Sequence, residues 1–248
     1  MSKVRALILR APGTNCDEET ACAFEQAGAE VSLIHISQLI SRTKQLKDYQ
    51  IMVIPGGFTY GDDIGAGRVL ANQIRLKIGR DIEKFVSSGR LILGICNGFQ
   101  VLVKTGILPG LPLTSKPPLT LTTNDSGKFE CRWVYLKANR DSHCVFTRGI
   151  ERMYLPVAHG EGKVIADPKV LPNLDVVLYY TDERGSTKAG YPYNPNGSME
   201  DIAGISDTTG RIFALMPHPE RFVRGSQHPR WPSEGTKERG DGFRIFTN

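Results

Sequence analysis

The sequence LILGICNGFQ, residues 91–100, joins a short apolar run to a segment that begins a helix. The run LILGI is apolar except for its glycine, which is typical of a strand buried on both faces. A helix is expected to open at Asn97. Gly94 and Gly98 flank Cys96 in a G-x-C-x-G pattern, and small residues at these positions leave room for a sharp strand-to-helix turn. The segment predicts a parallel sheet with a cysteine at the end of one strand.

The first half of the chain repeats this alternation of apolar runs and amphipathic segments. A strand that is apolar on both faces needs helices on both. We therefore predict an α/β fold, with a doubly wound, mostly parallel, flavodoxin-like sheet that has helices on both faces, and a β-rich second half. The expected strands are residues 4–9, 31–36, 51–55 and 91–95, and the expected helices are residues 17–27, about 38–46, about 69–88 and the segment from Asn97.

The second half, from Leu108 onward, contains proline-rich turns and β-like runs. Residues 119–123, 129–136 and 176–182 are such runs, and IAGIS and IFALMP flank the turn DTTG as a hairpin that returns to the sheet. The chain has no internal repeat and no low-complexity linker, so we predict one domain over residues 1–248. The tail from Arg224 is expected to lie at the surface.

Composition narrows the classes of protein. The chain has 31 Lys and Arg against 26 Asp and Glu, a net charge of +5, without the run of like charges of a nucleic-acid tail. No apolar run reaches the roughly 20 residues that span a bilayer. The first ten residues lack a signal-peptide pattern, and the five cysteines lack C-x-x-C spacing. We expect a cytoplasmic protein with reduced thiols that binds neither nucleic acid nor a membrane.

Cys96 is the candidate nucleophile. The turn places it at a helix N-terminus, whose partial positive charge favours the thiolate. The backbone N–H of Asn97 is then suited to bind an oxyanion. The alternative is a buried cysteine whose flanking glycines only allow tight packing of helix on sheet. Cys96 follows the C-terminal end of a strand, where ligands of open α/β sheets bind, and this position favours its interpretation as a nucleophile.

The candidate base is His218, in the sequence MPHPE. In an extended segment His218 and Glu220 project to the same side, so the carboxylate can orient the imidazole. Pro219 disfavours helical geometry at His218. His159 competes for the role, because AHGEG also places a carboxylate, Glu161, two residues later. Of the other histidines, His35 is expected to be packed in the core or at a sheet edge, and His143 and His228 to be exposed.

The loop PGGF, residues 55–58, follows the third expected strand and would face Cys96 from the neighbouring strand. Adjacent glycines have no side chains to shield their backbone N–H groups from a ligand, so Gly57 is our candidate for a second oxyanion donor. The rival interpretation, a phosphate loop, lacks the G-K-[ST] of a Walker motif. No His/Cys group has zinc-ligand spacing, so no metal site is expected, and the other cysteines are interpreted as small buried hydrophobic residues.

GICNGFQ, PGGF and PHPE together resemble the class I, triad-type glutamine amidotransferases. Further segments, spread from residue 12 to about residue 222, resemble the glutaminase subunits of phosphoribosylformylglycinamidine synthase, a subfamily of purine biosynthesis. These segments are PGTNCDEET, GGFTYGDD, AHGEGK, YNPNGSMEDIAGI and PHPERF. Residues 108–118 and 225–248 show no such resemblance.

The resemblance implies that the protein hydrolyses glutamine through a cysteinyl thioester and passes ammonia to a synthetase. It implies roles for seven residues: Cys96 as nucleophile, His218 as base and then acid, Glu220 as the residue that orients it, Gly57 and Asn97 as the oxyanion hole, and Phe58 and Gln100 as glutamine-binding residues. For Gln100, the alternative is an ordinary exposed helix residue.

The resemblance also implies the partners. No cofactor is expected on this chain; ATP, Mg and formylglycinamide ribonucleotide would bind a separate synthetase subunit, often joined by a small third subunit. Three alternatives remain open at this point. They are a cysteine peptidase or stress protein on the same fold, a non-catalytic module that senses glutamine, and a glutaminase that serves another acceptor.

Overall fold

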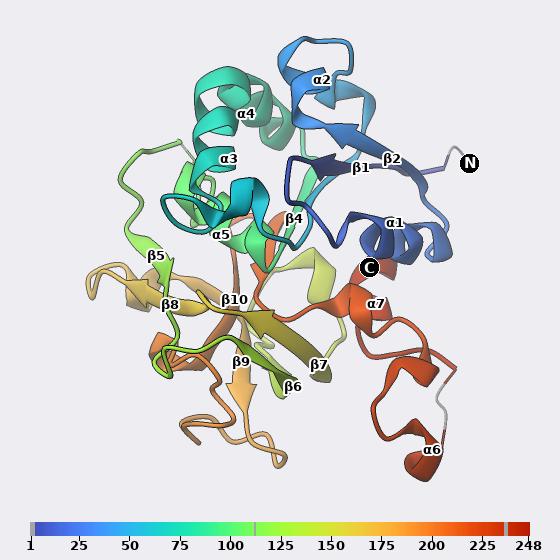
Figure 1. Ribbon diagram of the computed structural model, residues 1–248, viewed down its shortest axis with the longest axis vertical. Helices are drawn as coiled ribbons and strands as arrows, with labels where there is room; N and C mark the ends of the chain where they lie inside the picture. Colours follow the sequence, from blue (N-terminus) through green and yellow to red (C-terminus); the bar gives the residue numbers. More distant parts are fainter. Residues whose placement is uncertain (1–2, 112, 236–237) are drawn as a thin grey trace.

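The computed structural model describes residues 3–111, 113–235 and 238–248. Its centre is a sheet of nine strands in the order β2-β1-β3-β4-β11-β10-β9-β6-β7 (Figure 1). The first five strands in this order are parallel, and each later neighbour is antiparallel. The predicted α/β fold, a mostly parallel sheet with a β-rich second half, is therefore confirmed. The one-domain prediction remains a prediction, and its first two residues lie outside the described part.

The strands are short, as expected for a twisted α/β sheet. In chain order they are β1 Arg5–Arg10, β2 Glu30–His35, β3 Ile51–Ile54, β4 Leu91–Ile95, β5 Leu119–Thr122, β6 Glu130–Ala138, β7 Arg152–His159, β8 Lys163–Ala166, β9 Asp175–Thr181, β10 Ile202–Ser206 and β11 Ile212–Leu215. Strands β5 and β8 form a separate antiparallel pair.

The α-helices mostly follow the strands of the first half. They are α1 Asp17–Gln26, α2 Ile36–Ile40, α3 Arg68–Gln73, α4 Gly79–Ser87, α5 Asn97–Thr105, α6 Trp231–Glu234 and α7 Phe243–Thr247. Helices α1 and α7 pack together on one face of the sheet, and α5 packs with α3 on the other (Figure 1). This two-sided cover is the reason that the central strands are apolar on both faces.

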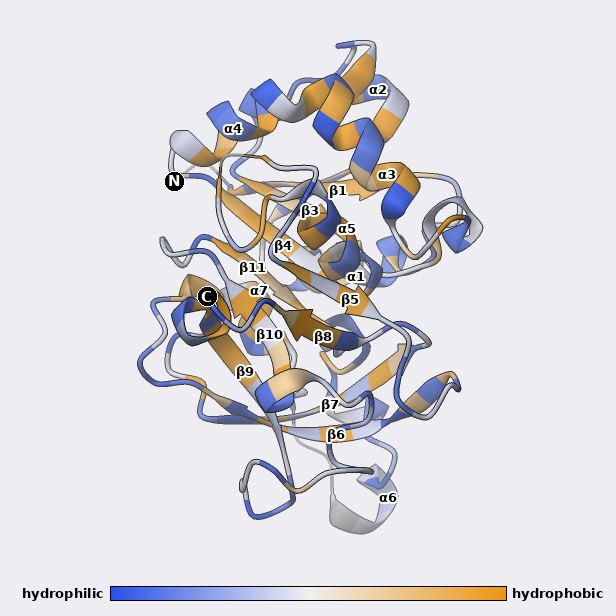
Figure 2. Ribbon diagram, turned by 90° about the vertical axis from the view of Figure 1, so that its left-hand side faces the viewer, coloured by the Kyte–Doolittle hydropathy of each residue, from blue (hydrophilic) through white to orange (hydrophobic). Residues whose placement is uncertain are grey.

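The core follows the strands at the centre of the parallel region. All four residues of β11 and the four inner residues of β1 are at most 1% exposed. Hydrophobic residues are concentrated in the strands of the sheet, and hydrophilic residues lie on the outer faces of the helices (Figure 2). Burial on both faces fixes these strands in place and makes their carboxyl ends a firm base for a site.

Three expectations about elements need correction. The single helix expected over residues 69–88 is α3 and α4 joined by a π-helical turn, Ile74–Ile78. The polar helix near residues 38–46 shortens to α2, which His35 caps from the edge strand β2. Strands β7 and β8 were not predicted. Pro156 within β7 argues against a strand, but β7 is an edge strand, where the missing N–H is tolerated.

Two surface predictions are also wrong in part. The end of the tail is buried, because Ile245 and Phe246 pack against α1, and the ring of Phe246 meets Phe24 at 5.1 Å. His143 is exposed as expected, whereas His228 is half-buried beside the rings of Trp133 and Phe222.

The remaining cysteines do not share one environment. Cys16 and Cys144 are buried as expected, and burial raises the pKa of Cys144 to about 11. Cys22 is half-buried, and Cys131, on β6, is exposed, so the expectation of buried cysteines fails there. Alternate residues of a strand point to opposite faces, and this face of β6 meets solvent at Cys131.

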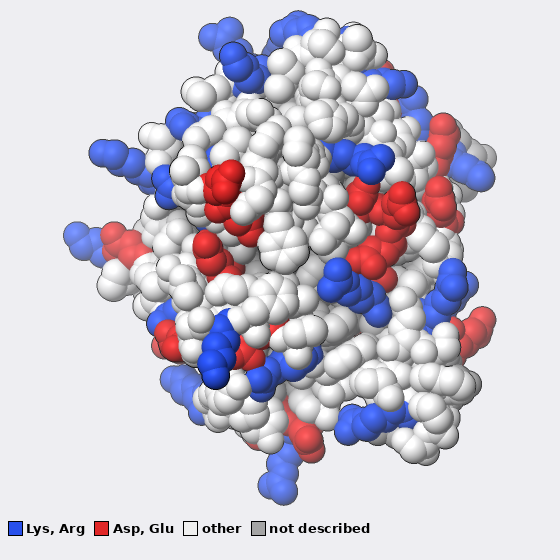
Figure 3. All heavy atoms as spheres, in the orientation of Figure 1, with Lys and Arg blue, Asp and Glu red and all other residues white. Residues whose placement is uncertain are grey.

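Charge on the surface is mixed. On the face shown in Figure 3, basic and acidic side chains are interspersed. In the described residues, no helix combines the length and apolarity that crossing a membrane requires.

Candidate active site

The turn at Cys96 has the geometry of a nucleophile elbow. Strand β4 ends at Ile95 and α5 begins one residue after Cys96, which has φ 50° and ψ −103°. Such a conformation is strained for a residue with a side chain, and strain of this kind is common at functional positions. The glycines on either side are required. A Cβ at Gly98 would overlap the carbonyl of Ile54, and one at Gly94 would lie 2.9 Å from the backbone of Gly98.

Strand β11 brings the PHPE segment to the same end of the sheet. It pairs in parallel with β4, so Leu215 lies opposite Ile95, and the Cys96 N–H donates to the carbonyl of Leu215 at 2.8 Å. On the other side, the edge strand β7 contacts both candidate residues. The carbonyl of Pro156 accepts from the His218 N–H at 2.8 Å, and the Cys96 Sγ lies 3.7 Å from the Ala158 carbonyl oxygen.

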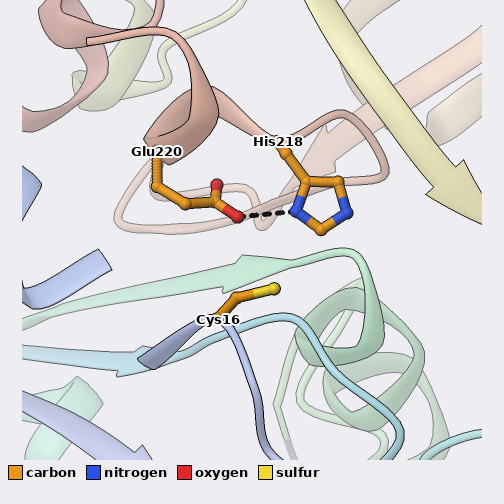
Figure 4. A group of neighbouring side chains, drawn as sticks. All are labelled: Cys16, His218 and Glu220. Carbon is orange, nitrogen blue, oxygen red and sulfur yellow. Dashed lines mark hydrogen bonds and ion pairs between the residues drawn. The ribbon is translucent and has the colours of Figure 1, made fainter. Parts of the chain in front are cut away.

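His218 and Glu220 form a buried pair. The His218 Nδ1 lies 2.6 Å from the Glu220 Oε1 (Figure 4), and the two side chains are at most 2% exposed. Within the described residues, the opposite nitrogen, Nε2, is buried and has no hydrogen-bond partner. Burial alone would lower the pKa of His218, but the Glu220 carboxylate, followed by the nearby thiol groups of Cys96 and Cys16, raises it well above its usual value.

His159 lies in the same region but has a different environment. Its Nδ1 lies 3.2 Å from the Asn124 Oδ1, and burial, with the charge of His218, lowers its pKa to about 3. Glu161 does not orient it, because this carboxylate accepts from the backbone N–H of Ala66 and lies 3.8 Å from Lys104. An imidazole with so low a pKa and no carboxylate partner is a weak base, so the geometry favours His218.

The PGGF loop is fastened to the loop that follows β1. The Phe58 N–H donates to the Gly13 carbonyl at 2.9 Å, and the Cys16 N–H donates to the Gly56 carbonyl at 3.2 Å. Gly57 has φ 147°, and a Cβ there would lie 2.8 Å from the Gly13 oxygen, so only glycine fits. In the described part of the chain, no hydrogen bond from the Gly57 N–H is found, which leaves this donor available to an oxyanion.

Asn97 links the elbow to the loop after β3. Its Oδ1 accepts from the backbone N–H and the hydroxyl of Thr59, at 3.3 and 2.7 Å. Its Nδ2 donates to Gln100 at 2.8 Å, and Gln100 donates to the Glu161 carbonyl at 2.6 Å. Gln100 is only 4% exposed, so it is not an ordinary exposed helix residue. Phe58 is 43% exposed, and its ring faces Phe129 at 6.3 Å.

The site is closed in this conformation. Cys96 is 5% exposed, and the His218 and Glu220 side chains are less exposed still. Little of the Cys96 side chain is therefore exposed, and the loops around it control how a substrate reaches the thiol. The PGGF loop is one wall of the site, because a Cβ at Gly56 would meet the His218 ring at 2.8 Å.

Cys16 is a member of the site that the sequence analysis did not assign. It follows β1, and its thiol points at the His218 ring from the side that also carries Glu220 (Figure 4). The Arg221 guanidinium donates to its Sγ at 3.1 Å. Burial raises the pKa of Cys16 although His218 and Arg221 oppose this effect. A separation of about two hundred residues hid this contact, and the segment PGTNCDEET was the only available signal.

The family model described as the CobB/CobQ-like glutamine amidotransferase domain matches residues 3–248. The chain belongs to this glutamine amidotransferase family. A solved structure described as PurLQS from Thermotoga maritima aligns with a TM-score of 0.75 and 34% sequence identity, over 99% of this chain and 96% of that one.

Relatives named phosphoribosylformylglycinamidine synthase subunit PurQ match over nearly the whole chain. The protein from Dehalococcoides mccartyi is 64% identical over 248 residues, which are 100% of this chain and 97% of the relative. The protein from Methanococcus maripaludis strain S2 is 46% identical over 246 residues, covering 96% of this chain and 90% of the relative. A structure described as a glutamine amidotransferase from Thermotoga maritima is 17% identical, with a TM-score of 0.54 over 93% of this chain and 81% of that one, and shares the fold.

Proposed function

We propose that this chain is the glutaminase subunit of a phosphoribosylformylglycinamidine synthase, and that Cys96, His218 and Glu220 carry out the hydrolysis of glutamine. The relatives that share 64% and 46% of their residues with it bear the name of this subunit. The mechanism rests on the different surroundings of the two ring nitrogens of His218. One ring nitrogen is bonded to a buried carboxylate, the other has no hydrogen-bond partner within the described residues, and the Cys96 thiol interacts with the ring.

The reaction proceeds in two stages. His218 takes the proton of the Cys96 thiol, and the thiolate attacks the side-chain amide carbon of glutamine. The tetrahedral intermediate collapses as His218 gives its proton to the leaving nitrogen, which departs as ammonia. A glutamyl thioester remains on Cys96. In the second stage, His218 takes a proton from water, the hydroxide attacks the thioester, and glutamate leaves as the thiol is restored.

Two backbone N–H groups are the proposed donors to the oxyanion of each stage. Asn97 is the first residue of α5, where an N–H has no partner within the helix. The proposed second donor is the N–H of Gly57, in the PGGF loop. A backbone donor that stabilises the oxyanion is worth roughly 10²–10³ in rate. Gln100, bound to Asn97, and Phe58, at the exposed rim, are the proposed contacts of the glutamine.

The partners follow from the same proposal. Ammonia released by Cys96 would pass to a synthetase subunit that binds ATP, Mg and formylglycinamide ribonucleotide, with a small third subunit in the complex. The alignment with the chain from PurLQS supports an assembly of this kind. This chain would then need no cofactor of its own, and the cytoplasm is the compartment that suits the pathway.

Reconstitution tests the function directly. The purified chain is combined with the candidate synthetase, ATP, Mg and formylglycinamide ribonucleotide, and formylglycinamidine ribonucleotide is measured with glutamine as nitrogen donor. We expect product that depends on this chain. Product from ammonium but none from glutamine would rule out the proposed subunit, and product with a different acceptor would favour a glutaminase of another pathway.

Coupling to the partner is expected to control the closed site. We predict that kcat/KM for glutamine rises roughly 10²–10³-fold when the loaded synthetase binds, because a shift of the PGGF loop would open the site and supply the Gly57 donor. Ammonia made without an acceptor would be protonated in water and wasted. The measurement compares glutamate release by the free chain with that of the complex that holds nucleotide and acceptor.

A matched pair of glycine variants isolates the loop. Gly57→Ala is strained and crowded against Gly13, so it should weaken the activation. Gly28→Ala shares a positive φ, of 94°, but its Cβ would meet nothing within 4 Å, so it should lose stability without losing activation. Equal kcat/KM for the free chain and the loaded complex would show that the chain is an independent glutaminase.

A further inference from the structure

Three side chains of different chemistry meet at one buried point beside the PGGF loop. A ligand atom of Cys16, one of His218 and one of Glu220 all lie within 4.8 Å of one another. All three residues are at most 2% exposed. Figure 4 shows the thiol, which comes from the loop after β1, aimed at the His–Glu pair at the end of β11. Catalysis as derived above uses His218 and Glu220 but leaves Cys16 without a role.

We propose that Cys16, His218 and Glu220 form a binding site for a thiophilic divalent cation of the Zn²⁺ class, and that its occupation shuts off the glutaminase. The metal would take the ring nitrogen that Glu220 orients, together with the carboxylate itself. His218 could then no longer act as a base toward Cys96. The binding of the metal stands on the geometry alone, whereas its inhibitory effect rests on the proposed function.

The donor set matches the chemistry of zinc. Thiolate sulfur, imidazole nitrogen and carboxylate oxygen are its usual ligands, at roughly 2.0–2.3 Å, so the donors of a tetrahedral site lie about 3.5 Å apart. The three ligand atoms lie within 4.8 Å of one another, so the pairs that are too far apart must close by at most about 1.3 Å. The His218–Glu220 hydrogen bond, at 2.6 Å, must open slightly to admit the ion. Within the described residues, the Glu220 Oε2 is buried and has no partner, so an oxygen is available to complete the third bond.

The charges also permit a divalent ion. A thiolate and a carboxylate together neutralise its two positive charges. Arg221, whose guanidinium lies 3.1 Å from the Cys16 sulfur, would add a cation, but its Nε is bonded to Glu19 at 2.9 Å, which offsets that charge. Mg²⁺ and Ca²⁺ prefer six or more oxygen ligands, so a site of one sulfur, one nitrogen and one oxygen selects against them.

The metal ion and the substrate would reach the buried site by the same route, past the PGGF loop. Gly56, in the PGGF loop, covers both the His218 ring and the Cys16 sulfur, since a Cβ there would lie 2.8 Å from one and 3.0 Å from the other. A movement of this loop that admits glutamine to Cys96 would also admit a much smaller ion to Cys16. Three protein ligands leave the fourth position of the metal to water.

Cobalt binding to the full chain tests the site without reference to activity. The protein carries Cys22→Ser and Cys131→Ser, which remove the two thiols that are not buried. Titration with Co²⁺ should produce a thiolate-to-cobalt charge-transfer absorption, which Zn²⁺ abolishes and Mg²⁺ does not. Loss of a mere outer-shell partner already weakens a metal site 10–100-fold, so Cys16→Ser, or Cys16→Ala, should weaken binding by more than about 100-fold. Cys96→Ala should keep the absorption.

The opposite pattern would overturn the site. If no thiolate absorption appears, or if it survives in both Cys16 variants and disappears in Cys96→Ala, the metal does not bind here. Thermal unfolding of each variant shows that a lost signal is not a lost fold. For the inhibitory effect, Zn²⁺ should stop glutamine hydrolysis by the reconstituted complex, whereas the complex with Cys16→Ala should keep most of its own metal-free rate. Hydrolysis that continues with the metal bound would refute inhibition, whereas no hydrolysis without metal would refute the proposed function instead.

Discussion

Cys96→Ala is expected to abolish glutamine hydrolysis, with a loss on the order of 10⁶ in kcat, while the complex that contains it still makes product from added ammonium. The thioester cannot form without the sulfur, and no other described thiol occupies a strained strand-to-helix turn and interacts with His218. The partner performs the amination, so the two activities separate. Glutamate release and ammonium-dependent product are measured on the same preparation.

Cys131→Ala is the matched control, because it removes an exposed thiol from β6 and should leave both activities unchanged. Loss of the ammonium-dependent reaction in Cys96→Ala would mean that the variant damages the complex rather than the chemistry. Persistence of glutamine-dependent product at the normal rate would remove Cys96 from the role of nucleophile.

Glu220→Gln is expected to lower kcat for glutamine by roughly 10³–10⁴, and His218→Ala by more, on the order of 10⁶. The amide keeps the shape of the carboxylate but not its charge, so it no longer fixes the tautomer or stabilises the imidazolium across the 2.6 Å contact. Glutamate release under saturating glutamine, in the loaded complex, provides the measurement.

His159→Ala serves as the comparison, because His159 is a second buried histidine of the same region. We expect it to retain more activity than His218→Ala, since its pKa of about 3 keeps it neutral and Glu161 is bonded elsewhere. If Glu220→Gln stayed within a factor of about two of the wild type while His159→Ala lost all turnover, the base would belong to the AHGEG segment.

The sequence predicted those parts of the molecule that depend on local patterns. The run LILGI and the pattern around Cys96 specify a buried strand and a turn within ten residues, and both are present. IAGIS and IFALMP were expected to form a hairpin that returns to the sheet, and β10 and β11 do pair antiparallel, with β11 beside β4. A strand that is buried on both faces must consist almost entirely of apolar residues, so its sequence identifies it clearly.

The parts that were missed depend on contacts between distant segments. Cys16 and His218 are about two hundred residues apart, and no local spacing reveals that they meet. The role of Asn97 as a link to Thr59 is hidden for the same reason, since its place in the sequence is that of an ordinary first residue of a helix. Strand β7 was not predicted; it contains Pro156, which a strand tolerates at the edge of a sheet.

Cys96 and Cys16 both lie near His218, so the central claim, that Cys96 is the nucleophile, can be measured directly by asking which cysteine reacts first. The loaded complex is treated with a glutamine-analogue electrophile, with and without glutamine, and the modified cysteine is located by peptide mass spectrometry. The account predicts that Cys96 is labelled first and that glutamine protects it, although Cys131 is far more exposed. First labelling of Cys16, or labelling that glutamine does not prevent, would contradict the assignment of Cys96 as the nucleophile.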